Sequence, residues 1–345
     1  MRLEYRPFSL ALREPLGTAA DRIDTREGFL VRVREDGVVG IGEATPLPGW
    51  TESLSACEDG LERAADAVDS GSVEGAVRAV EDAPAARHGL TLALADAQGR
   101  DRALPLYRFL AGPERVGRVP VNATIGDGTP AAAEGAARHA VEDGFRTLKL
   151  KVGAGDLDRD LRRLRAVRTA VGREVELRAD ANGAWGFDRA HEAIEAFAEL
   201  GVSLVEQPLP ADELEGHAAL RGLGPEIAVD EGVLHHGIDA VIEAEAVDAV
   251  VLKPMALGGV GIARELATWA GEAGVEPIVT TTIDGAVART GAIHLAAAIP
   301  DVGACGLATA GLLAEDLCPD PAPIDNGAAV VPQAKGLGVP EVWEP

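Results

Sequence analysis

The sequence predicts an α/β protein, a (β/α)₈-type barrel with an N-terminal α+β capping domain that the C-terminal tail completes. Three observations predict this fold. Short apolar runs alternate with helical stretches after about residue 119, the first 118 residues follow a different pattern, and the tail has strand-like pieces of its own. An open doubly wound sheet is the alternative architecture, because a strand count alone does not establish closure.

The expected capping domain covers residues 1–118. Its segment "GFLVRVREDGVVGIGEA" contains two apolar runs separated by Asp36 and Gly37, a pair typical of a tight hairpin turn. Helical patterns follow from about Glu52 to Leu110. We therefore expect an antiparallel hairpin followed by helices.

The expected barrel covers residues 119–318 and contains eight strand–helix units. Its strand-like runs are "VPVNATIG", "RTLKLKVG", "VELRADANG", "VSLVEQPL", "EIAVDEG", "AVVLKPMALGG", "EPIVTTTID" and "ACGLATAG". Helical stretches between them have apolar residues at spacings of three and four and end in Gly, a helix stop signal. The Pro- and Gly-rich tail, residues 319–345, is expected to return to the capping domain.

Composition limits the classes of partner. The formal net charge is −24, which disfavours nucleic acid and anionic membrane surfaces. The chain lacks an apolar run of about 18 residues and an N-terminal secretory pattern, so we expect a cytoplasmic protein without a membrane span. Abundant acids together with scarce lysine suggest adaptation to high salt, which screens repulsion between carboxylates.

Lysine is rare and unevenly placed. Of the four lysines, Lys149 and Lys151 lie two residues apart near the end of the second barrel run, and Lys253 ends the sixth. Residues i and i+2 of a strand share a face, so Lys149 and Lys151 point the same way. Active sites of such barrels lie at the carboxyl ends of the strands, where we expect these lysines.

Each strand between these lysines ends in an acid. Asp180, Glu206 and Asp230 end the third, fourth and fifth runs, about one strand–helix unit apart. Acids are common here, with 56 Asp and Glu in 345 residues, so a single acid is weak support. Three acids in register, between strands that carry lysines, are stronger support for a shared site. Crowded carboxylates need a cation, and hard oxygen ligands suit Mg²⁺, with Mn²⁺ a possible substitute.

This constellation suits the removal of a proton next to a carboxylate. A divalent cation takes up the negative charge that develops on the carboxylate oxygens, and a lysine whose pKa is lowered acts as the base. The alternative from a different class is a barrel that binds a ligand without catalysis.

The motifs resemble those of the enolase superfamily, muconate-lactonizing subgroup, over essentially the whole chain. The matching stretches are "KLK" (149–151), "DANGAW" (180–185), "EQPL" (206–209), "DEG" (230–232) and "KP" (253–254). The resemblance implies Mg²⁺ ligation by the three strand-end acids and catalysis by Lys151 and Lys253 on opposite faces of the substrate. It implies that Lys149 lowers the pKa of Lys151, with Arg178 and Glu231 as further neighbours of the site.

The capping-domain stretch "GEATPLPGWTES" resembles a loop of the o-succinylbenzoate synthases of menaquinone biosynthesis, within the same subgroup. The resemblance extends to the hydroxyl-rich "TTTIDG" that ends the seventh run. Dipeptide epimerases usually carry Asp-x-Asp at the eighth run, which here reads "GLATAGLL". The expected substrate contacts are Gly49, Trp50, Asn182, Gly258, Thr281 and Thr282.

The favoured activity is dehydration of 2-succinyl-6-hydroxy-2,4-cyclohexadiene-1-carboxylate to 2-succinylbenzoate. The alternatives are N-succinylamino-acid racemase, dipeptide epimerase and muconate cycloisomerase. The expected partner is a small-molecule carboxylate substrate, and a homo-oligomer is possible.

Two further patterns have simpler interpretations. The stretch "GGVGIARE" lacks the third glycine of a dinucleotide loop and predicts a tight turn. His235 and His236 predict surface or packing roles at a helix start.

Overall fold

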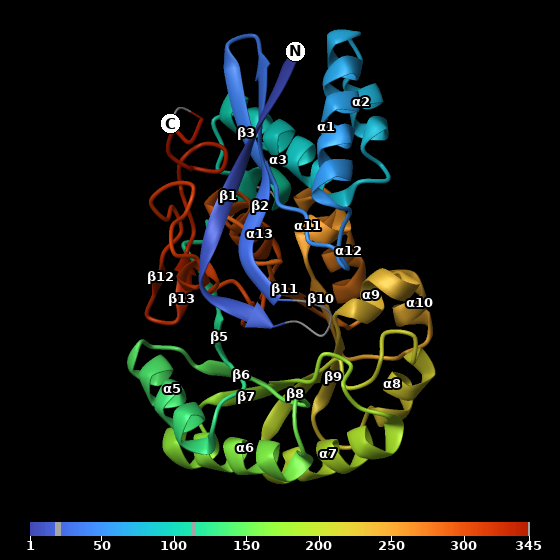
Figure 1. Cartoon of the computed structure of the whole chain (residues 1–345), viewed down its shortest axis with the longest axis vertical. Helices are drawn as coiled ribbons and strands as arrows, with labels where there is room; N and C mark the ends of the chain where they lie inside the picture. The colour runs from blue at the N-terminus through green and yellow to red at the C-terminus, as the bar shows by residue number, and fades with distance from the viewer. Residues whose placement is uncertain (18–21, 112–114, 344–345) are drawn as a thin grey trace.

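The computed structural model describes residues 1–17, 22–111 and 115–343. Residues 18–21, 112–114 and 344–345 of the predicted capping domain and tail lie outside the described residues. Figure 1 shows the N-terminal sheet and helices at one end of the molecule and a curled parallel sheet, covered by helices, at the other. Among the described helices, none has both the length and the apolarity that a membrane crossing requires.

The N-terminal part contains one antiparallel sheet followed by helices. Its strands, in the order β1-β2-β3, are β1 (Arg2–Gly17), β2 (Arg22–Glu35) and β3 (Val38–Ala44). Its helices are α1 (Leu54–Asp69), α2 (Val73–Ala79), α3 (Pro84–Asp101) and α4 (Leu106–Ala111). Asp36 and Gly37 join β2 to β3 with φ of 49° and 82°, as a two-residue hairpin turn requires, so the predicted hairpin is confirmed.

Glycine lets α3 lie directly on β3. A Cβ atom at Gly40 would be 2.0 Å from the Ala93 carbonyl oxygen, and one at Gly42 would be 2.0 Å from that of Gly89. Only glycine permits such a close approach of strand and helix backbones. This explains the "GIGEA" pattern and fixes the position of the end of β3, which carries Glu43.

Seven parallel strands form the barrel sheet. In the order β11-β10-β9-β8-β7-β6-β5 they are β5 (Asn122–Ile125), β6 (Thr147–Lys151), β7 (Glu176–Asp180), β8 (Val202–Glu206), β9 (Glu226–Val229), β10 (Ala249–Leu252) and β11 (Glu276–Val279). The helices that follow them are α5 (Pro130–Glu142), α6 (Leu157–Val171), α7 (Phe187–Glu199), α8 (Leu214–Leu220), α9 (Glu231–His236), α10 (Ile238–Glu243), α11 (Pro254–Leu257), α12 (Val260–Glu272) and α13 (Ala286–Ala298).

Small apolar side chains fill the barrel beneath the predicted site. Leu204, Ala228 and Val251 belong to one buried cluster with Ala249 and Ile278. Each of the first three lies two residues before a predicted site residue that ends or directly follows the same strand, so the cluster and the site share the inward face. The cluster supports the site from below.

The eighth predicted run closes the ring without forming a regular strand. Cys305 makes a single parallel bridge with Val121, and Gly306 makes one with Thr280, so the run joins the two edges of the sheet. The expected eighth helix is absent from the described residues that follow, where a short 3₁₀ helix, η1 (Ala310–Leu312), stands instead. The prediction of eight complete strand–helix units was wrong on this point, because "ACGLATAG" has few β-branched or aromatic residues and the prolines of "DLCPDPAP" follow it closely.

The C-terminal tail pairs with β4 (Arg118–Pro120) and packs against the N-terminal part of the chain. The short strand β13 (Ala328–Val330) pairs antiparallel with both β12 (Ile324–Asp325) and β4, in the order β12-β13-β4. Farther on, Leu337, Val339 and Val342 share a buried cluster whose other members include Leu30, Ile41 and Leu92 of the N-terminal part. Figure 1 shows the C-terminal end beside the β1–β3 sheet. We propose that the described part of the predicted tail, residues 319–343, forms part of the capping unit.

Candidate active site

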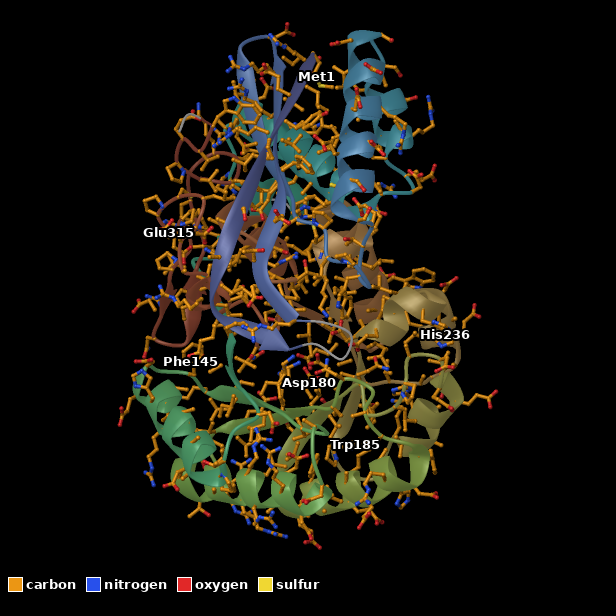
Figure 2. All side chains as sticks on the ribbon, in the orientation of Figure 1. Met1, Phe145, Asp180, Trp185, His236 and Glu315 are labelled. Atoms are coloured by element: carbon orange, nitrogen blue, oxygen red, sulfur yellow. The ribbon has the colours of Figure 1, made fainter. Side chains whose placement is uncertain are left out.

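The predicted site residues gather at the carboxyl ends of neighbouring barrel strands. The parallel register places Lys151 of β6 beside Asp180 of β7, and Asp180 beside Glu206 of β8. Asp180 lies between the barrel sheet and the lower end of the β1–β2 hairpin (Figure 2). The mouth of the barrel therefore faces the capping elements, as the fold class predicts.

Lys149 and Lys151 both contact the acids. The Lys149 Nζ lies 3.0 and 2.9 Å from the two carboxylate oxygens of Glu206 and 3.1 Å from Asp180 Oδ2. The Lys151 Nζ lies 2.6 Å from the same Asp180 oxygen. Both ammonium groups point into one site, as their two-residue spacing predicts.

Lys253 approaches from the other side. Its ammonium pairs with Asp230 Oδ2, and it lies 3.3 Å from the centre of the Trp50 ring. Trp50 belongs to the capping-domain loop, so this cation–π contact brings that loop over the end of the sixth barrel run. The predicted specificity loop thus lies next to one of the two predicted catalytic lysines.

Burial and mutual repulsion control the charges of the acids. Burial and the negative charge of Asp180 raise the pKa of Glu206 to about 7, although Lys149 opposes the shift. Burial also raises the pKa of Asp230. Burial alone would raise the pKa of Asp180, but Lys149 and Lys151 hold it below its usual range. Burial disfavours charge on Lys149, yet the neighbouring acids outweigh burial and raise its pKa.

The donor set fits a hard divalent cation. As placed, the side chains of the described residues include no group of three or more His, Cys, Asp or Glu arranged to hold a metal ion. Asp180 and Glu206 instead pair with lysine ammonium groups. Two observations nevertheless fit a cation. Asp230 Oδ1 is buried without a hydrogen-bond partner, and Glu206 carries a pKa raised partly by its acidic neighbours. Three carboxylates of this kind would supply oxygen ligands for Mg²⁺.

Asn182 and Glu231 lie beside the lysine–acid cluster. The Asn182 Oδ1 accepts a hydrogen bond from Lys151 at 2.8 Å, and its Nδ2 donates to Glu231 at 3.4 Å. Arg178 lies one layer deeper in the barrel, where it donates to Glu176 and to the Ala304 carbonyl oxygen at 2.8 and 2.9 Å. Arg178 therefore balances charge and ties β7 to the closing run.

The remaining predicted substrate contacts are more scattered. The hydroxyls of Thr281 and Thr309 lie 3.1 Å apart, joining the ends of the seventh and eighth runs. The Thr282 hydroxyl instead donates to Asp284 at 2.5 Å. Gly49 occupies the loop turn with φ of 94°, and Gly258 lies in the turn after α11.

The two patterns given simpler interpretations occupy ordinary structural positions. The first two glycines of "GGVGIARE", Gly258 and Gly259, form the predicted tight turn after α11, and the rest of the stretch begins α12. His235 and His236 lie in the last turn of α9, not at a helix start, and His236 contacts the Ala211 carbonyl oxygen at 2.9 Å. The helix is short enough that its first and last turns are adjacent, which explains the misplacement.

Sequence reasoning missed Glu43, a junction between the capping domain and the barrel. Its fully buried carboxylate accepts the backbone N–H groups of Gly285 and Ala288, at 2.7 and 2.8 Å, in the first turn of α13. Thr45 donates to it at 2.5 Å. Burial, followed by the negative charge of Asp284, raises the pKa of Glu43 to about 7. The available signal was an acid at the end of the apolar strand "VVGIGEA".

Arg26 was also missed, and it fixes the loops around the mouth. Its buried guanidinium donates to the carbonyl oxygens of Thr45, Pro46 and Ile283, at 2.9, 3.0 and 3.2 Å. One side chain thus ties the start of the Trp50 loop to the loop after β11. The alternating pattern of the strand predicts which face Arg26 occupies, but it does not predict that the guanidinium group is buried.

A capped β/α barrel with lysines and carboxylates opposed at its strand ends defines a class of barrel enzymes. Two family models match the chain: "Enolase C-terminal domain-like" over residues 131–341 and "MenC, N-terminal domain" over residues 3–97. The chain belongs to the enolase superfamily.

The relatives differ in activity. A hydrophobic dipeptide epimerase of Enterococcus faecalis is 31% identical and covers 98% of each chain. An o-succinylbenzoate synthase of Thermobifida fusca is 40% identical, over 59% of this chain and 63% of its own. Among solved structures, the Enterococcus faecalis V583 dipeptide epimerase complexed with Mg and the dipeptide L-Leu-L-Tyr has a TM-score of 0.86 at 28% identity, with 98% of each chain covered.

Proposed function

We propose that this chain is an o-succinylbenzoate synthase, which dehydrates 2-succinyl-6-hydroxy-2,4-cyclohexadiene-1-carboxylate to 2-succinylbenzoate in the cytoplasm, for menaquinone biosynthesis. The observation that carries the proposal is the chemistry at the ends of the seventh and eighth runs. Thr281 and Thr309 offer neutral hydroxyls there, and residues 302–314 contain no Asp or Glu. Hydroxyl donors suit a second substrate carboxylate, whereas a buried substrate ammonium needs a negative partner.

The proton transfers are assigned to Lys151. Its neutral amine takes the proton next to the substrate carboxylate, and the C–H electron pair passes into an enediolate. Those electrons then form the ring double bond as the neighbouring C–O bond breaks. The Lys151 ammonium returns its proton to the departing oxygen, so that water leaves and Lys151 is neutral again.

Lys253 is assigned to charge stabilisation. Its ammonium lies between Asp230 and the Trp50 ring, on the other side of the site from Lys151. From there it faces the negative charge that develops on the substrate. Trp50 covers this position and limits the access of water.

Asp180, Glu206 and Asp230 would hold Mg²⁺, or Mn²⁺ in its place. Bound there, the cation would act as a Lewis acid towards the substrate carboxylate. Lys149 contacts two of these acids and would keep their charge balanced. Asn182 would hold Lys151 in place.

Dipeptide epimerisation is the second candidate. The observation that favours it is the full-length match to the Enterococcus faecalis dipeptide epimerase, which contrasts with the higher but partial identity to the synthase. N-succinylamino-acid racemisation uses the same proton-removal step and is a further candidate activity.

Parallel assays with the purified chain and Mg²⁺ would test the proposal. The cyclohexadiene substrate should give growing aromatic absorbance, which EDTA should abolish and excess Mg²⁺ restore. Hydrophobic dipeptides and N-succinyl amino acids in D₂O would be followed by exchange of the α-proton. Faster exchange of a dipeptide than dehydration of the cyclohexadiene, compared as kcat/KM, would reject the synthase assignment in favour of the epimerase.

A further inference from the structure

Gln207 directly follows Glu206, and its contacts reach the turns after all three acid-bearing strands. The residue is 1% exposed and has a φ of 44°. Residues other than glycine rarely adopt such a left-handed conformation, and when they do the surrounding structure must enforce it. The contacts of Gln207 enforce this conformation.

The backbone of Gln207 links the end of β8 to both neighbouring strand ends. Its carbonyl oxygen accepts the N–H of Gly183 at 2.7 Å, in the turn that follows Asp180. Its own N–H donates to the Ala228 carbonyl oxygen at 2.8 Å, near the end of β9. The left-handed conformation turns the carbonyl towards the Gly183 side.

The side chain of Gln207 holds the turn after β9. Its Oε1 accepts the backbone N–H of Asp230 at 2.9 Å and that of Gly232 at 3.2 Å. These are the first N–H groups of the turn that opens α9, so the amide oxygen determines where the Asp230 backbone lies. One residue thus connects the turns that place Asp180, Glu206 and Asp230.

A buried histidine fixes the orientation of this amide. The Gln207 Nε2 lies 2.9 Å from the Leu209 carbonyl oxygen and 3.3 Å from His217 Nε2. His217 Nδ1 lies 2.8 Å from the Glu213 carbonyl oxygen. Since a carbonyl only accepts, Nδ1 carries the hydrogen, and Nε2 is left to accept from Gln207. A flipped amide would set NH₂ against two backbone N–H donors, so the network has one consistent arrangement.

We propose that Gln207 is a positioning residue that sets the spacing of the three carboxylates, and that neutral His217, with its hydrogen on Nδ1, locks the Gln207 amide. The inference rests on the proposed metal ligands but not on the identity of the substrate. Buried partners of metal ligands typically change metal affinity by 10- to 100-fold when they are removed. The same scale applies to a residue that connects all three ligand-bearing turns.

Mn²⁺ binding to the purified full chain without substrate tests the proposal. Free Mn²⁺ would be measured by electron paramagnetic resonance for the wild type, Gln207→Leu and His217→Leu. We expect Kd to rise at least tenfold in Gln207→Leu, and by a smaller factor in His217→Leu, which removes only the lock. The matched control is Gln333→Leu, because Gln333 Nε2 also donates to two carbonyl oxygens, those of Val116 and Val331, but in the tail. Its Kd should stay that of the wild type.

A second measurement needs no metal ion and does not require Gln207→Leu to fold. ¹⁵N NMR of the wild type should show a buried histidine with its hydrogen on Nδ1 that is lost in His217→Leu. Unchanged Mn²⁺ affinity in folded Gln207→Leu, or a hydrogen on Nε2 of His217, would overturn the proposal. A wild type that fails to bind Mn²⁺ would remove the metal site itself and this inference with it, whereas loss of synthase activity with intact Mn²⁺ binding would count only against the proposed function.

Discussion

Replacing Glu43 by Gln should remove one step from the pH dependence of stability. The folded pKa of about 7 lies above the ordinary value of 4.5, because burial and Asp284 outweigh the helix N–H donors. The folded protein therefore holds a proton on Glu43 that the unfolded chain releases from about pH 4.5 upward. The contribution of this proton to the free energy of unfolding is fully present below pH 4.5 and is lost as the pH rises through 7. The difference between a pKa of about 7 in the folded protein and the ordinary 4.5 corresponds to about 3 kcal/mol.

Three charged or titratable groups lie close to Glu43, and the Cys318 thiol also feels its charge. Asp284 precedes α13, Arg26 lies on β2, and His88 on α3 contacts the Glu43 carbonyl oxygen at 2.8 Å. All three remain in Glu43→Gln, so the difference between wild type and variant isolates the carboxyl group. Burial lowers the pKa of His88, which works against a positive charge next to Glu43.

Urea unfolding at a series of pH values and one fixed salt concentration measures this difference. The wild type should lose about 3 kcal/mol relative to Glu43→Gln between pH 4.5 and 8. Glu176→Gln is the control, because hydrogen bonds and charge from Arg178 lower the pKa of Glu176 despite its burial, so its contribution changes only at lower pH. A difference that stays flat, or that grows in favour of the wild type as the pH rises, would show that the N–H donors of α13 dominate and would refute the reasoning.

Four further predictions follow from the structure. Lys151→Met should reduce kcat of the dehydration about 10²- to 10⁴-fold with little change in Tm, and retention of a tenth of the activity would exclude Lys151 as the base. Trp50→Leu should lower kcat/KM about tenfold through loss of the contact with Lys253, whereas unchanged kinetics would show that the loop does not act on this lysine. Gly42→Ala should destabilise the fold by more than about 2 kcal/mol in urea unfolding, because its Cβ would lie 2.0 Å from the Gly89 oxygen, while Gly135→Ala in open space on α5 should be neutral or stabilising. The free energy of unfolding should rise between 0.1 and 2 M KCl because the net charge is −24, and full stability in dilute buffer would contradict adaptation to salt.

The sequence alone predicted the relative positions of residues wherever those positions follow from strand geometry. The two-residue spacing of Lys149 and Lys151 gave their shared face, and the regular spacing of Asp180, Glu206 and Asp230 gave neighbouring strand ends. Both inferences need only strand alternation and parallel order. The hairpin at Asp36 and Gly37 was equally accessible, because its turn chemistry is local.

Sequence reasoning failed where function depends on contacts between distant segments. The bonds of Glu43 to α13 join residues more than 240 positions apart, and no local pattern reports them. Arg26 and Gln207 act through backbone groups of other loops, whose positions depend on the complete fold. The hydrogen bond from the Thr282 hydroxyl to Asp284 was likewise not predicted, and the substrate contact expected of Thr282 stays a prediction.

The position of the tail has a consequence for how the chain is made. Leu337, Val339 and Val342 are synthesised after the whole barrel, yet they complete a cluster with Leu30 and Ile41, which are synthesised before it. During translation, part of the apolar surface of the N-terminal sheet therefore stays uncovered until the barrel and the tail have been synthesised. A premature stop codon near residue 320 would therefore yield a chain that keeps Lys151 and Lys253, the proposed catalytic residues, but exposes an apolar surface to chaperones and proteases.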